Sequence, residues 1–233
     1  MQLSCALILA ALTAGSTAHF VLKDPPPRGF SEDQLVNFPC GGQAPSRQRY
    51  DVSLVRPTVN IALQMGHDQS AVQVLMALGT DPGSNFNITL KPTFRQVGLG
   101  DFCIPGISLD RDVLGVDPIE NMNATIQVVT NGDPKGGLYN CADIFFSSRA
   151  NLPDAGKCKN GTGVSAQLFS GAAAQRNANV STPNGQAQSG GGSSSSGTSS
   201  GAPRPTSSSS AASLDTAAWG VMGAVVAGGL ALL

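Results

Sequence analysis

Apolar and polar residues alternate in short runs through the middle of the chain, without the longer period that marks helices. The runs are rich in Val, Ile, Thr and Phe. Turn sequences such as Asp-Pro-Gly at 81–83 and Asn-Gly at 131–132 separate them. We predict strands at Val52–Val55, Thr58–Leu63, Val72–Ala77, Asn87–Thr93, Gly98–Ile104, Ala124–Thr130 and Leu138–Ser147. The apolar run 71–78 also suits a short helix. Together the runs predict an all-β fold, an antiparallel β-sandwich of immunoglobulin or fibronectin type III character.

The N-terminal end differs in composition from this middle part. An apolar run from Cys5 to Leu12 is followed by small residues. Ser16 and Ala18 fill the −3 and −1 positions that signal peptidase requires. We therefore predict a secretory signal over residues 1–18, a mature chain that begins at His19, and one folded domain over residues 19–180.

The C-terminal end has the composition of a flexible stalk and an anchor. Residues 181–213 consist mostly of small and polar residues, which cannot build a packed core. In the tail, residues 214–233, the run Ala217–Leu233 is apolar and uncharged. This order is typical of a GPI-attachment signal that is removed, and a single transmembrane anchor is the alternative. We predict GPI attachment within the stalk and a location on the extracellular face of the plasma membrane or in the cell wall.

Cysteine usage agrees with secretion. Of the five cysteines, Cys5 leaves with the signal. An even number then remains, which predicts two disulfides in a secreted chain. Three pairings are possible, and we favour Cys40 with Cys141 and Cys103 with Cys158.

Surface features point the same way. Four Asn-X-Ser/Thr triplets are N-glycan acceptors, at Asn87, Asn123, Asn160 and Asn179. A glycan requires an exposed asparagine, so we expect these residues on the surface. The formal net charge of −1 gives no electrostatic footprint for nucleic acid.

The two histidines carry the sharpest functional signal. An N-terminal His19 offers two nitrogens, the free α-amine and the ring Nδ1, which together close a chelate ring on one metal ion. His67 can supply a third nitrogen. Three nitrogen donors in a tetragonal arrangement suit Cu(II) better than most first-row ions, so we predict one Cu(II) per chain. The alternative is that both histidines are ordinary side chains without a metal.

A carboxylate is the candidate for the remaining ligand. Asp143 lies in an apolar run, where an ionised carboxylate is costly unless it is paired or bound to a cation. We interpret it as a metal ligand, and pairing with a base such as Arg149 is the alternative. Asp68, beside His67, is a candidate to orient that histidine.

These motifs together resemble a known family. They are the mature N-terminal His19, the Gly-His-Asp loop at 66–68, the Cys-Ala-Asp-Ile run at 141–144, and the segments around Pro25–Gly29 and Phe38–Gly42. The chain looks like the fungal copper-binding proteins that are related to lytic polysaccharide monooxygenases but do not oxidise polysaccharide, the copper acquisition factors. The resemblance implies that His19 and His67 form a histidine brace and that Asp143 takes an axial position.

The resemblance also implies a function and its alternatives. The expected role is non-catalytic binding of extracellular copper in support of copper uptake, by a monomer that serves a plasma-membrane copper transporter. The runner-up is a copper-dependent monooxygenase or oxidase acting on a cell-wall polysaccharide, with Tyr139 or Phe145 in the axial place. A structural wall protein is a third class. Few aromatic residues remain for a sugar-binding face, because the single tryptophan, Trp219, lies in the tail.

Overall fold

The computed structural model of the chain describes residues 19–132 and 136–189. The predicted signal, the tail and most of the stalk lie outside the described residues. No helix within the described part is long and apolar enough to cross a membrane.

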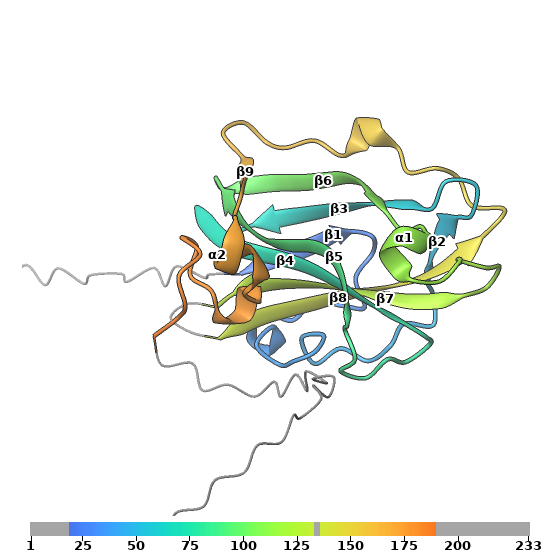
Figure 1. Ribbon diagram of the computed structural model, residues 1–233, viewed down its shortest axis with the longest axis horizontal. Helices are drawn as coiled ribbons and strands as arrows, with labels where there is room; N and C mark the ends of the chain where they lie inside the picture. Colours follow the sequence, from blue (N-terminus) through green and yellow to red (C-terminus); the bar gives the residue numbers. More distant parts are fainter. Residues whose placement is uncertain (1–18, 133–135, 190–233) are drawn as a thin grey trace, which may run out of the picture. The chain divides into compact units, whose positions relative to one another are not determined.

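Two β-sheets make up the domain (Figure 1). The smaller sheet has the strand order β1 (Phe20–Asp24), β3 (Thr58–Met65) and β6 (Gly100–Ser108). The larger sheet has the order β2 (Tyr50–Ser53), β8 (Gly137–Ser147), β7 (Asn123–Asn131), β4 (Gln69–Leu78), β5 (Ile88–Val97) and β9 (Ser165–Leu168). All strand pairs are antiparallel except β2 with β8.

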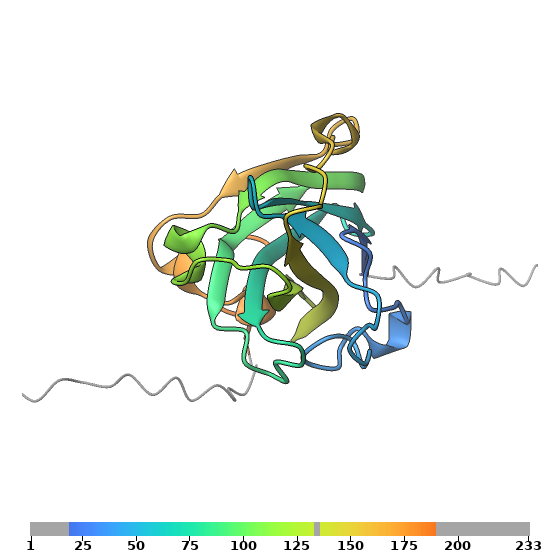
Figure 2. The same cartoon turned by 90° about the vertical axis from the view of Figure 1, so that its right-hand side faces the viewer.

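The sheets pack face to face around one apolar core, as the end-on view shows (Figure 2). Phe20 and Ile61 of the smaller sheet and Ile126 and Phe146 of the larger one are almost completely buried there. This arrangement confirms the predicted β-sandwich. The ambiguous run 71–78 is strand, because β4 is central in its sheet and is paired on both sides.

The sequence pattern does not predict two of the strands, β1 and β9. β1 is only five residues long, too short for its alternation to stand out. All residues of β9 are exposed, so it has no apolar face to reveal it.

The described helices are short and lie between strands. They are α1 (Arg111–Leu114), α2 (Gly171–Gln175) and the 3-10 turns η1 (Glu32–Gln34), η2 (Ala155–Lys157) and η3 (Ala178–Val180). The α1 turn shows local control by capping: the side chain of Asp110 accepts from the Val113 amide at 3.2 Å, and Gly115 ends the helix at φ 75°.

Two disulfides join Cys40 to Cys141 and Cys103 to Cys158, the pairing that we favoured. The first fastens the long segment between β1 and β2 to β8. The amide of Tyr139 also donates to the carbonyl of Leu35 at 2.8 Å, so this segment runs beside β8. It carries η1.

The ordered domain continues past the boundary that we placed at residue 180. Ser181 is buried and forms a bridge with Ala187. The Gln188 side chain donates to the Gly136 carbonyl at 3.1 Å and accepts from the Gly136 amide at 2.7 Å. Hydrogen bonds of polar groups, which leave no apolar pattern, hold this stretch to the domain.

Candidate metal centre

The pairing of β1 with β3 brings the two histidines to one place. Phe20 is opposite Met65, and the Gly66 amide donates to the His19 carbonyl at 2.9 Å. His67 is the next residue and lies in the connection, residues 66–68, from β3 in one sheet to β4 in the other. The alternation that buries Phe20 in the core turns the preceding side chain, His19, to the opposite face of the strand.

Both imidazoles have buried nitrogens without a hydrogen-bond partner among the described residues, namely Nδ1 of His19 and Nε2 of His67. A buried polar atom without a partner costs free energy, and natural proteins explain such atoms by a role or a ligand. Nδ1 is also the ring atom that closes a chelate with the α-amine of the same residue. The pair therefore offers the nitrogen set that suits Cu(II).

Glu32 approaches this pair. Its Oε1 lies 2.6 Å from Nδ1 of His19, an ion-pair contact, although it is not among the hydrogen bonds of the described residues. Among residues 19–132 and 136–189, no three His, Cys, Asp or Glu side chains are gathered into a complete metal site. A brace needs only two side chains, because the α-amine is its third donor.

Asp143 has different partners. Its Oδ1 accepts from Arg28 Nη2 at 2.9 Å and from the Thr125 hydroxyl at 2.7 Å. Its Oδ2 accepts from Arg28 Nε at 2.9 Å and from the Ser46 amide at 2.6 Å. Arg49 adds a second positive charge at 3.7 Å. The carboxylate is fully buried, and both of its oxygens are used by protein donors.

The protonation of Asp143 follows from these contacts. Burial raises its pKa, but the hydrogen bonds from Arg28, Thr125 and Ser46 lower it by more, so the pKa of Asp143 lies below its ordinary value. The group is a buried anion, and the two arginines compensate its charge.

The comparisons with known proteins now decide the family. The family model described as copper acquisition factor BIM1-like matches residues 17–163, more than half of the chain. The chain belongs to this family.

Relatives agree with the assignment. An uncharacterised protein of Aspergillus fumigatus is 59% identical over 226 residues, 93% of each chain. A lytic polysaccharide monooxygenase-like protein X325 of Yarrowia lipolytica is 34% identical over 180 residues, covering 74% of this chain and 65% of the relative. The copper acquisition factor BIM1 of Cryptococcus neoformans is 27% identical over 163 residues, 66% of this chain and 72% of the relative.

In this BIM1-like chain, the expectation that Asp143 joins the histidines is wrong for the structure described. Asp143 of β8 is opposite Thr125 of β7, and Thr125 is opposite Ala77 near the end of β4. His67 lies at the other end of β4, just before its first residue, Gln69. Eight residues of strand separate the two levels, about 26 Å at about 3.3 Å per residue. The buried carboxylate of Asp143 is paired with a cation, as expected, but that cation is Arg28 and not a metal ion or Arg149.

The other predicted groups also have identifiable places. Asp68 is exposed, and its backbone carbonyl accepts from the Gly98 amide at 2.7 Å; its role in orienting His67 stays a prediction. The Tyr139 hydroxyl accepts from Asn179 Nδ2 at 3.1 Å. Phe145 is opposite Asn123 at the Asp143 end of the sheet. Neither aromatic residue therefore suits the axial place that the oxidase alternative requires.

The glycan acceptors fall into two groups. Asn87 and Asn160 are exposed, as expected. Asn123 and Asn179 are half-buried, and each donates its Nδ2 to a neighbour, Thr80 in the first case and Tyr139 in the second. Asn123 and Asn179 are thus less exposed than Asn87 and Asn160, and glycosylation at the four sites stays a prediction.

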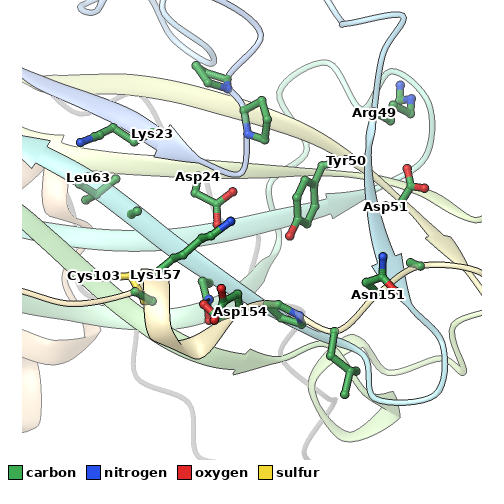
Figure 3. Close-up of a pocket in the computed structure, with 18 of the residues that line it drawn as sticks. Lys23, Asp24, Arg49, Tyr50, Asp51, Leu63, Cys103, Asn151, Asp154 and Lys157 are labelled. Carbon is green, nitrogen blue, oxygen red and sulfur yellow. Dashed lines mark hydrogen bonds between the residues drawn. A yellow bond between two sulfur atoms is a disulfide. The ribbon is translucent and has the colours of Figure 1, made fainter.

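A polar cavity of about 1060 Å³ lies elsewhere, among β1, β2, β3, β6 and the segment 149–159. Asp24, Tyr50 and Lys157 point toward one another in it (Figure 3). Burial raises the pKa of Asp24, an effect that Lys157 partly offsets, and burial together with the nearby carboxylates raises the pKa of Tyr50. The residues that line this cavity do not include either histidine, so it is separate from the candidate metal centre.

Proposed function

We propose that this protein binds one Cu(II) ion at the cell surface through a histidine brace and supports copper acquisition without catalysing a reaction. The ligands are the α-amine and Nδ1 of His19 and a ring nitrogen of His67. Both residues lie at the end of one strand pair and are half-buried, so the site is near the surface of the domain.

The observation that carries this proposal is that the β1–β3 corner brings together His19 and His67, each of which has a buried imidazole nitrogen without a hydrogen-bond partner among the described residues. Backbone hydrogen bonds fix that corner, so the donors are held in place before the metal arrives, which lowers the ordering cost of binding. Membership in the copper acquisition factor BIM1-like family supports copper as the ion.

The absence of catalysis is part of the proposal. The oxidase alternative assigns the axial place to Tyr139 or Phe145. The hydroxyl of Tyr139 is engaged by Asn179, and Phe145 lies at the other end of β8. Neither ring is available to complete an oxidising copper site, which favours binding and transfer of the ion.

The cell-surface location rests on the predicted signal over residues 1–18 and the predicted GPI signal in the tail. A GPI-anchored monomer with a copper ion near the surface of its domain is suited to deliver that ion to a copper transporter in the same membrane. We propose such a transporter as the protein partner.

The experiment is a Cu(II) titration of the secreted mature protein against a competing chelator, with wild type, His67→Ala and Gln64→Ala. Gln64 is half-buried on β3, three residues from His67, and serves as the matched control. We expect His67→Ala to weaken binding by more than about a hundredfold, the upper limit for losing a group that only orients a ligand. Equal affinity of the two variants, at equal melting temperature, would exclude His67 as a ligand.

A further inference from the structure

We propose that the polar cavity between the smaller sheet and the segment 149–159 binds a short, uncharged oligosaccharide. Its volume of about 1060 Å³ is close to the upper end of the range that is typical of small-molecule sites, about 300–1,000 Å³. Neither histidine lines this cavity. The inference therefore goes beyond the proposed function and does not depend on a copper ion.

The segment 149–159 closes the cavity from the solvent side. It runs over β6 and β3, and the disulfide between Cys158 and Cys103 fastens it to β6 (Figure 1). Asn60 of β3 donates Nδ2 to the carbonyl of Asp154 at 3.4 Å. Asn60 points away from the core, because the residues on both sides of it lie in the core, and yet it is only 4% exposed. The segment thus encloses a space over a sheet face that would otherwise be open to solvent.

A β-bulge in β1 directs Asp24 into this space. Leu22 is opposite Leu63 of β3. Asp24, two residues further along β1, is opposite Ala62, only one residue further along β3. With regular pairing, Asp24 would follow the alternation of Leu22 and face the core. The extra residue instead places it on the face of Ala62, which lines the cavity, and bulges that re-aim a side chain in this way are frequent next to functional sites.

Three polar side chains in the cavity have no partners of their own. Asp24, Tyr50 and Lys157 point toward one another (Figure 3). Among residues 19–132 and 136–189, none of these three side chains forms a hydrogen bond or an ion pair, whereas another lining pair, Lys23 and Asp101, is in contact at 3.0 Å. Burial raises the pKa of Asp24, so its carboxylate has lost hydration without gaining a protein donor. A hydroxyl group of a ligand would supply that donor.

The chemistry of these groups selects the class of ligand. A carboxylate accepts hydrogen bonds from neighbouring hydroxyls, an ammonium group donates to hydroxyl and ring oxygens, and the ring of Tyr50 offers an apolar face to a sugar ring. The charges of the lining nearly cancel, with five lysines and arginines against four aspartates. An uncharged ligand keeps that balance, whereas a charged one would disturb it. The volume exceeds what a single sugar ring needs, which favours a short oligosaccharide.

The test is a calorimetric titration of the secreted mature protein. The probes are two uncharged tetrasaccharides, laminaritetraose and tetra-N-acetylchitotetraose, and the anionic tetragalacturonate. Asp24→Asn is compared with Asp117→Asn, which makes the same change of net charge at an exposed residue outside the cavity. Tyr50→Phe is compared with Tyr139→Phe, which removes a hydroxyl that Asn179 engages elsewhere. The melting temperature shows whether each variant is folded.

We expect wild type to bind at least one uncharged tetrasaccharide more tightly than tetragalacturonate. Asp24→Asn should weaken this binding about tenfold or more and Tyr50→Phe about threefold or more, because each removes a hydrogen bond to the ligand, while both controls bind like wild type.

Two results would overturn the proposal. One is that wild type binds neither uncharged tetrasaccharide or prefers the anionic one. The other is equal affinity of Asp24→Asn and Asp117→Asn at equal melting temperature. If Asp24→Asn does not fold, equal affinity of Tyr50→Phe and Tyr139→Phe overturns the cavity as the site in the same way.

Discussion

Replacing Asp143 by Asn separates a structural role of this residue from a role in copper binding. The substitution keeps the shape of the side chain but leaves the buried Arg28 facing an amide. In the wild type, four donors converge on the two carboxylate oxygens. The amide keeps one oxygen and presents N–H groups where Arg28 or Ser46 now donates.

The magnitude follows from these contacts. About two of the four hydrogen bonds lose their acceptor, and a hydrogen bond to a charged group contributes about 1.5–3 kcal/mol. Breaking a buried ion pair by removing one partner costs about 3–5 kcal/mol, which agrees. For a domain of about 170 residues, each kcal/mol shifts the melting temperature by roughly 2–4 °C, so we expect a decrease of roughly 6–20 °C.

Thermal and urea unfolding of copper-free protein measure this loss. Asp117→Asn is the control, because the pair of Asp117 with Arg111 at 2.8 Å is largely exposed and contributes at most about 1 kcal/mol. Below the transition, Asp143→Asn should retain the wild-type copper spectrum. The reasoning is refuted if the variant melts like wild type but loses copper, since Asp143 would then serve the metal and not the fold.

Further predictions concern pH, glycosylation and the C-terminal segment. The pKa of Asp143 is lowered in the folded state, so its contribution to the free energy of unfolding is complete above about pH 4 and is lost as the pH falls through the folded pKa. Urea unfolding at pH 7 and at pH 3 should therefore show a smaller decrease in the free energy of unfolding for Asp143→Asn than for wild type. Peptide mapping of the secreted protein should find a glycan at the exposed Asn160 and none at Asn179, whose side chain packs against Tyr139; full occupancy at Asn179 would contradict the packing. Truncation after residue 180 should lower the melting temperature relative to truncation after 189, because it removes the Gln188 hydrogen bonds to Gly136; equal melting temperatures would show that this stretch contributes nothing.

The fold was largely predictable because most of its strands are short runs rich in Val, Ile, Thr and Phe that turn sequences separate. That signal is local, and it identified β2 to β8. It fails for β9, whose side chains are all exposed, and for β1, which is only five residues long. The sequence left three disulfide pairings possible, because the pairing depends on which segments meet in the folded chain.

The candidate site was predictable in its histidines and not in its carboxylates. His19 stands out because it follows the predicted signal, and His67 because the chain has only two histidines. The burial of Asp143 required a cation, but the choice among a metal and 14 lysines and arginines depends on contacts 115 positions apart in the sequence, as with Arg28. Glu32 carries no sequence signal, because the turn that presents it reaches His19 only in the folded chain.

The central claim, a histidine brace, is tested most directly by adding one alanine before His19 in the secreted mature protein and repeating the Cu(II) titration. The extension turns the α-amine into an amide and removes one donor, while His19 and His67 stay in place. The account predicts that the mature protein binds one Cu(II) tightly and that the extended protein loses this site at an unchanged melting temperature. Equal affinity of the two proteins would contradict the brace.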